Sequence, residues 1–282
     1  MYITLASEFH YLRQPMRLIT IPVSHYCEKA RWGLIHAGVD YVEDAHLQLF
    51  HYLVARRYNT RGMVPILVTD TGAITDSTEI LRFLDQRLPE SAKLYPKSQI
   101  QEVEALEEDF DERFGIETRR WVYFNLRTLP ARQILKLAGQ GTPLWERAIA
   151  PPFFSPLFRF LLHSLDVSRE NVDRGFPVIS DTFDWVKTRL SDGRPFLCGD
   201  RFTAADLTFA SLAAPVLWPP EYGIKFPPLE EVPPSARDAI GQFRAHPAGE
   251  FALRLFREHR SPATDTQPSG TGTLAQKAAP SP

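Results

Sequence analysis

The chain of 282 residues is 44% hydrophobic and 23% charged, which is typical of a folded globular protein with one or two domains. Its formal net charge of −2 gives no basis for binding nucleic acid through phosphate neutralisation. The two cysteines, Cys27 and Cys198, are too few for a secreted disulfide framework, and no Cys/His cluster has the spacing of a metal site. We expect a cytoplasmic protein that holds no metal.

No stretch of the sequence predicts a signal peptide or a membrane span. The N-terminus lacks a basic segment followed by an apolar run. The apolar stretch 153–165 is interrupted by Pro156 and Arg159, and the stretch 207–218 runs into Pro219, so both fail as spans on length.

Residues 17–88 predict an α/β domain. Strands and helices follow the order β-α-β-α-β-β-α, as indicated by the period of the apolar residues and by the placement of glycine and proline. Gly38 stands where a helix commonly ends, and Pro89 stops the last helix. The predicted elements cover residues 17–23, 26–37, 41–45, 49–58, 64–68, 73–75 and 76–88.

The remainder of the chain predicts a second domain of a different kind. Residues 89–97 read as a linker, and residues 98–260 as an all-helical domain. Residues 1–16 are expected to be an N-terminal extension. Residues 261–282 are rich in Ser, Thr, Pro, Gly and Ala and are expected to be a disordered tail.

Within the helical domain two helices are predicted by periodicity. Apolar residues step by three or four along 100–114 and along 176–190. Pro177 must then lie in the first turn of the second helix or at a kink. The segment 129–173 is rich in aromatic residues and proline, and its elements are left unassigned.

A first motif, at residues 22–31, places Ser24 between the first strand and the first helix. Free backbone N–H groups and the helix dipole favour a negative charge there. A hydrogen bond to a charged sulfur supplies about 1.5–3 kcal/mol, and the helix terminus about 0.3–1 kcal/mol. Lowering a thiol pKa from about 8.5 by about two units needs roughly 2.7 kcal/mol. Ser24 could therefore hold a thiolate without acting as a base, or it could simply cap the helix.

Two further motifs follow in the same domain. The Val64-Pro65 step opens a strand, where proline cannot donate to the ladder, so it indicates a sheet edge or a loop junction. Asp76 and Glu79 have the spacing of a capping box. The same helix end, with the Ser77 hydroxyl, could also receive a carboxylate.

Together, PVSHYCEKAR (22–31), GMVPILV (62–68) and TDSTEILRFL (75–84) resemble the thioredoxin-like, glutathione-binding domain of the glutathione transferase family. The segment FLCGDRFTAAD (196–206) resembles the start of a helix in the helical domain of that family. The resemblance implies an α/β thioredoxin-like N-terminal domain and an all-α C-terminal domain. It also implies glutathione as co-substrate and a homodimer.

The resemblance assigns a role to each matching residue of these motifs. Ser24 would hold the glutathione sulfur. Pro65 would be cis, so that the backbone of Val64 pairs with the cysteinyl part of glutathione. Asp76 would pair with the γ-glutamyl ammonium and Ser77 with the γ-glutamyl carboxylate.

The chain also departs from the family pattern. His25 replaces the usual proline and could perturb the site or point to solvent. Cys27 stands where glutaredoxin-like relatives carry their second cysteine, and it could have a lowered pKa or be structural. Tyr26 is a rival hydroxyl donor or a packing residue. His51 falls near the position where relatives place a Lys or Gln for the glycyl carboxylate.

A transferase of this family also needs a pocket for a second, apolar substrate. In the family the first long helix and the last core helix of the helical domain line it. Arg119 and Arg120 could meet an anionic group, and the segment 129–173 could form a lid. The candidate lining residues are His25, Phe114, Trp121, Tyr123 and Trp218.

The resemblance predicts a glutathione S-transferase that conjugates a small apolar electrophile or displaces a group from it. Two alternatives stay open. Cys27 could serve a glutathione-dependent peroxidase or thiol reductase, or the chain could be a non-catalytic binding or scaffold protein with this fold.

Overall fold

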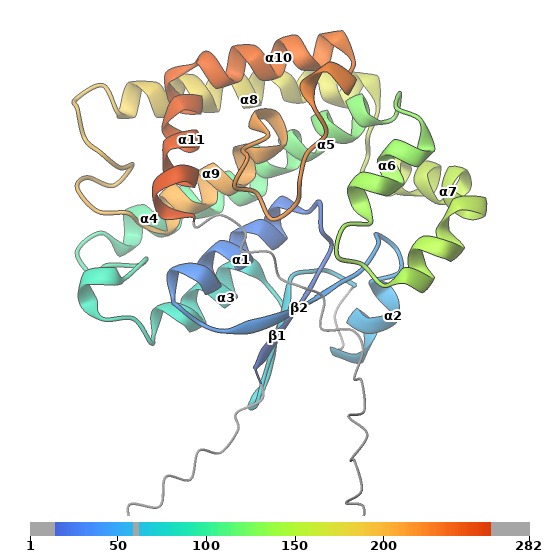
Figure 1. Ribbon diagram of the computed structural model, residues 1–282. Helices are drawn as coiled ribbons and strands as arrows, with labels where there is room; N and C mark the ends of the chain where they lie inside the picture. The colour runs from blue at the N-terminus through green and yellow to red at the C-terminus, as the bar shows by residue number, and fades with distance from the viewer. Residues whose placement is uncertain (1–14, 59–61, 261–282) are drawn as a thin grey trace, which may run out of the picture.

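The computed structural model describes residues 15–58 and 62–260. A sheet with its flanking helices forms one part, and a larger group of helices lies above it in Figure 1. The fold is thus a thioredoxin-like α/β domain followed by an all-helical domain, as predicted. Most of the expected extension and all of the expected tail lie outside the described residues.

The N-terminal domain is built on a four-stranded mixed sheet. The strand order is β2-β1-β3-β4, with β1 and β2 parallel and the other neighbours antiparallel. Successive side chains of β1 point to opposite faces: Leu18 joins the cluster between the sheet, α1 and α3, whereas Ile19 packs with Ala55 of α2. The elements are β1 (Met16–Thr20), α1 (His25–His36), β2 (Tyr41–Ala45), α2 (Tyr52–Ala55), β3 (Ile66–Thr69), β4 (Gly72–Ile74) and α3 (Ser77–Asp85).

The helical domain is arranged around α9, whose residues are all buried. A helix that is apolar on every side belongs in a core, and α9 contacts α1, α4, α5, α10 and α11. The domain contains α4 (Ile100–Asp109), α5 (Gly115–Leu126), α6 (Ala131–Ala138), α7 (Leu144–Ser164), α8 (Arg169–Arg189), α9 (Ala204–Leu217), α10 (Pro234–Ala245) and α11 (Pro247–His259).

The start of α9 confirms the reading of residues 196–206 as a helix start. The carboxylate of Asp206 accepts hydrogen bonds from the N–H groups of Thr203 at 2.8 Å and Leu197 at 2.7 Å. Burial raises the pKa of Asp206 to about 6. Asp206 and Thr203 therefore fix the turn that leads into the core helix.

Two helical predictions need correction. The expected helix 100–114 is not α-helical throughout, because α4 gives way to a π-helical turn, η3 (Phe110–Phe114), before α5 begins. Pro177 does not lie in the first turn of its helix. Ser168 caps α8 by accepting the N–H of Asn171 at 3.1 Å, so the helix begins two turns before the proline.

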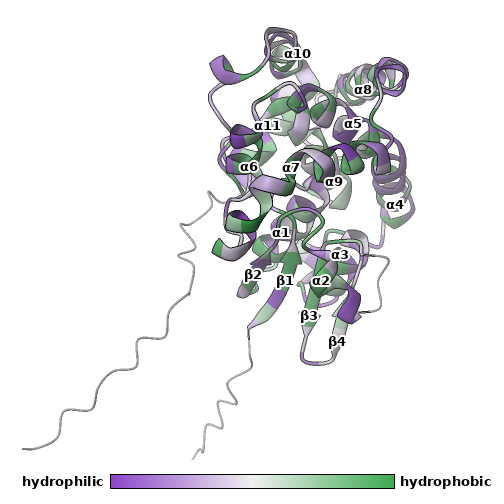
Figure 2. Ribbon diagram, turned by 90° about the vertical axis from the view of Figure 1, so that its right-hand side faces the viewer, coloured by the Kyte–Doolittle hydropathy of each residue, from purple (hydrophilic) through white to green (hydrophobic). Residues whose placement is uncertain are grey.

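The segment 129–173, unassigned from the sequence, folds into α6, α7 and the start of α8. α7 runs on through Pro151, Pro152 and Pro156. Figure 2 shows α6 and α7 on the side of the molecule that faces the viewer there. Across the described ranges, no helix is long and apolar enough to span a membrane.

Candidate active site

Ser24 lies in the connection between β1 and α1 and is partly exposed. β1 ends at Thr20, earlier than the predicted residue 23, and the Ser24 N–H closes a turn on the Ile21 carbonyl at 3.0 Å. The hydroxyl oxygen accepts the N–H of Cys27 at 3.3 Å, so Ser24 is the N-cap of α1. A hydroxyl that accepts in this way still carries a proton to donate. Capping and thiolate binding are thus compatible at this position.

Cys27 is fully buried one turn into α1. Burial raises its pKa, and the nearby Arg31 charge and the Ser24 hydrogen bond only partly oppose that effect. Of the two alternatives for Cys27, this direction weighs against a lowered pKa, because desolvation of the thiolate outweighs the helix terminus. A buried thiol of raised pKa fits a structural residue.

The Val64-Pro65 peptide bond is cis, as the resemblance implied. β3 begins only at Ile66, which pairs with Ile19 of β1. Among residues 15–58 and 62–260, the backbone of Val64 makes no hydrogen bond. This partly exposed backbone is thus available to an added extended strand.

The start of α3 lies close to the start of α1. Asp76 is exposed and caps α3, accepting the N–H groups of Thr78 at 2.8 Å and Glu79 at 3.2 Å. The Asp76 charge acts on the pKa of Tyr26 in α1. Ser77 follows as the first residue of the helix and is buried.

His51 does not present a cation to a ligand. Its Nε2 lies 2.8 Å from the Gly62 carbonyl, and its Nδ1 accepts the N–H of Leu49 at 3.1 Å. Burial lowers the pKa of His51 to about 4, so the ring is neutral at pH 7. Both ring nitrogens are hydrogen-bonded to backbone groups, so neither is free for the expected contact with a glycyl carboxylate.

A buried polar cluster joins the N-terminal ends of α1 and α3 to the helical domain. The Lys29 ammonium lies 2.8 Å from Glu107 Oε1, 2.5 Å from Asp111 Oδ2 and 2.9 Å from Thr78 Oγ1. Asp111 belongs to the π-helical turn. Its backbone carbonyl accepts a hydrogen bond from the Tyr26 hydroxyl at 2.7 Å. π-helical turns are frequent at functional sites.

His25 is buried and does not point to solvent. Its Nε2 lies 2.9 Å from the Gly115 carbonyl at the start of α5. Burial, aided by the nearby Arg119 charge, lowers its pKa to about 3. His25 is therefore a neutral link between the two domains.

Arg119, one turn further along α5, is a charged residue whose field reaches this link. Its charge acts on the pKa values of His25, Tyr26 and Tyr123. Its Nε is buried without a hydrogen-bond partner, and no carboxylate of the described residues pairs with it. Arg119 is thus a half-buried cation between α1 and the segment of α5 that carries Tyr123.

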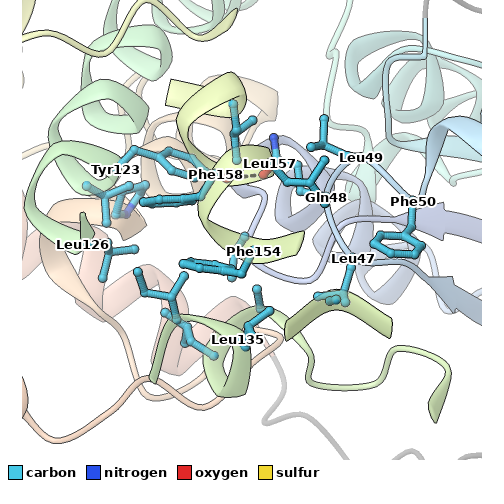
Figure 3. A pocket seen from close by; sticks show the side chains of 18 of the residues that line it. Leu47, Gln48, Leu49, Phe50, Tyr123, Leu126, Leu135, Phe154, Leu157 and Phe158 are labelled. Atoms are coloured by element: carbon cyan, nitrogen blue, oxygen red, sulfur yellow. Dashed lines mark hydrogen bonds between the residues drawn. The ribbon is translucent and has the colours of Figure 1, made fainter. Parts of the chain in front are cut away.

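An apolar cavity begins at Val23, the residue before Ser24. In Figure 3, residues 47–50 lie on one side, Tyr123 and Leu126 on the other, and side chains of α7 between them. Among the described residues, none that lines the cavity is charged. Its polar groups are occupied: Tyr123 bonds Gln48, Trp218 donates to the Pro215 carbonyl and Tyr222 to the Val23 carbonyl. The cavity is therefore suited to an apolar molecule.

Of the candidate pocket residues, Tyr123 and Trp218 line this cavity, whereas His25, Phe114 and Trp121 do not. Phe114 packs instead against Phe183 and Phe209 in the core. The lining that the sequence did not reveal comes from elements without a recognised motif: Leu47, Leu49, Phe50, Ile134, Leu135, Phe154, Leu157, Phe158 and Phe226. The expected lid over 129–173 thus contributes α6 and α7 as a wall.

Across the described part of the chain, no group of three or more His, Cys, Asp or Glu side chains could hold a metal ion.

Comparison with known families agrees with this geometry. Models of the glutathione S-transferase N-terminal and C-terminal domains match residues 18–92 and 169–238, which together make up just over half of the chain. No curated protein matches the chain.

Solved structures share the fold at low identity. A glutathione S-transferase from Rhodospirillum rubrum F11 is 22% identical with a TM-score of 0.52, covering 84% of this chain and 91% of its own. One from Sinorhizobium meliloti 1021 is 18% identical with a TM-score of 0.53, covering 89% and 96%. A theta class enzyme from Xanthomonas axonopodis pv. citri, solved with glutathione bound, is 16% identical with a TM-score of 0.51, covering 84% and 96%. At these identities the similarity concerns the fold alone.

Proposed function

Because the chain belongs to the glutathione transferase family, we propose that it binds glutathione at the start of α1 and transfers it to a small apolar electrophile. The observation that carries this proposal is the position of Ser24. It caps α1, and the residue before it lines an apolar cavity. A sulfur at Ser24 would meet an electrophile in that cavity.

In this proposal the glutathione thiol loses its proton to solvent, and the Ser24 hydroxyl donates a hydrogen bond that stabilises the resulting thiolate. The thiolate attacks an electrophilic carbon, an S–C bond forms, and the leaving group departs with its electron pair. The backbone of Val64 would hold the cysteinyl unit as an added strand. Asp76 and Ser77 would hold the γ-glutamyl end at the start of α3.

Burial of Cys27 weighs against the peroxidase or thiol reductase alternative, because a reactive cysteine must expose a thiolate.

We propose further that the chain acts in the cytoplasm as a homodimer, which light scattering of the purified protein would test.

The test pairs Ser24→Ala with Cys27→Ala in the full chain. Titration calorimetry first measures whether glutathione binds to the protein. If glutathione does not bind to the folded protein, only a scaffold role remains. Conjugation of chlorodinitrobenzene is then measured. Ser24→Ala should lower kcat/KM by about 10- to 100-fold, the value of one hydrogen bond to a charged sulfur. Cys27→Ala should keep most of the activity, and the opposite ranking would refute the role of Ser24.

A further inference from the structure

α7 is apolar on two faces. One face lines the cavity described above. On the other, Trp145, Ile149, Phe153 and Phe160 follow one another at helical spacing and are 49%, 48%, 54% and 59% exposed. A helix that is apolar on both sides is normally covered on both, yet each residue of this outer stripe stays about half exposed, with Trp145 in edge contact with Phe50. We call these four residues the outer stripe of α7.

The exposed charged side chains of α6 and α7 are all basic, although the whole chain has a net charge of −2. Residues 131–164 contain a single acidic residue, Glu146, whose side chain is fully buried and bound to His46. Figure 2 looks at the side where α6 and α7 lie. The two helices expose four basic residues that have no acidic partner among the described residues: Arg132, Lys136, Arg147 and Arg159.

We propose that the outer stripe of α7 docks on the surface of an anionic lipid bilayer. Aromatic and aliphatic side chains on one helix face enter the boundary between headgroups and acyl chains. Unpaired Lys and Arg side chains beside them meet the lipid phosphates. Because α7 does not qualify as a membrane span, it lies along the surface rather than across the bilayer.

The narrowness of the stripe favours a bilayer over a protein partner. A stable protein interface takes roughly 20–30 residues from each side, whereas this stripe is a single row along one helix. The basic residues also lack acidic counterparts on the same surface, so a second copy would bring like charges together. Docking at the bilayer is independent of the chemistry proposed for Ser24.

Purified full-length protein is sedimented with vesicles of phosphatidylcholine, with and without phosphatidylglycerol. We expect binding to the anionic vesicles, weakened by salt, and little binding to phosphatidylcholine alone. The double variant Phe153→Ser/Phe160→Ser should bind at least about tenfold more weakly. The double variant Arg132→Gln/Lys136→Gln should bind anionic vesicles about fivefold more weakly for each charge removed. Arg237→Gln/Arg257→Gln, which removes two exposed charges from α10 and α11, serves as the matched control and should bind like the wild type.

The outcomes separate the possible occupants of the stripe. The proposal is overturned if folded wild-type protein ignores anionic vesicles at low salt, or if the Phe153 and Phe160 variant binds as well as the wild type. It is also overturned if light scattering shows a dimer that this variant dissociates, since a second copy would then cover the stripe. A blue shift of tryptophan fluorescence on vesicles, absent in Trp145→Phe, would support it independently of sedimentation.

Discussion

Nδ1 of His46 lies 2.5 Å from Oε1 of Glu146 and thereby connects the end of β2 to the first turn of α7. The other carboxylate oxygen accepts the Leu47 N–H at 2.7 Å, and Nε2 of His46 lies 3.1 Å from Asp44. The segment from Leu47 to Phe50 and α7 both line the cavity. This contact therefore ties two of the segments that line the cavity to each other.

We expect the His46 contact to make folding stability depend on pH. Hydrogen bonds and charges of Asp44 and Glu146 overcome the effect of burial and raise the pKa of His46 from 6.5 to about 9. A raised pKa in the folded state gives stability that is complete below about pH 6.5 and is lost as pH rises through about 9.

Urea unfolding across this range measures the effect. The free energy of unfolding should fall between about pH 7 and 9, and His46→Gln should flatten the slope below pH 8. Above pH 8, the two buried thiols add a decrease of the same sign, and near pH 6.5 the depressed pKa values of His25 and His51 add an increase. The difference in slope between the variant and the wild type therefore isolates His46. Equal slopes for both proteins between pH 6.5 and 8 would contradict the prediction.

Lys29→Met should destabilise the protein by about 3–5 kcal/mol, because Glu107 and Asp111 would be left as unpaired buried carboxylates. Chemical denaturation measures this change. Arg113→Met is the matched control, since it removes an exposed pair with Asp109 and should cost at most about 1 kcal/mol. Similar costs for the two variants would show that the buried cluster contributes no more than a surface pair.

Arg119→Met should change substrate preference. The unpaired guanidinium would attract an electrophile that carries a carboxylate, so the variant should raise KM for a chloromethylbenzoate more than for the neutral chloromethylnitrobenzene. Arg119→Lys should restore part of the preference. If instead KM for glutathione rises equally with both electrophiles, Arg119 serves the tripeptide and not the second substrate.

The two thiols should resist labelling in the folded protein. Burial raises the pKa of Cys27, and burial with nearby carboxylates raises that of Cys198 to about 12. Reaction with a chromogenic disulfide at pH 8 should therefore be slow until denaturant is added, when both cysteines should react. Fast reaction of one equivalent in buffer, removed by Cys27→Ala, would reopen the reductase alternative.

Local signals in the sequence were sufficient for the elements near the proposed glutathione site. The strand at 41–45 was predicted, and the cap at Asp76 predicted the start of α3. The order of strands and helices was expected as well. These features depend on residues within a turn or two of one another, so they are readable along the chain. The cis bond at Pro65 was expected only from the resemblance to the family.

Tertiary contacts decided the rest. α7 remains helical through three prolines because its inner side packs on α6 and on the cavity lining. This stabilisation by tertiary packing cannot be predicted from local helix propensity. The neutrality of His25 and His51 and the raised pKa of Cys27 come from burial beneath segments distant in sequence. The sequence by itself determined the family and the polar motif at Ser24. Only packing between distant segments decided which side chains line the cavity and which charges remain without a partner, because burial and pairing are properties of the assembled chain.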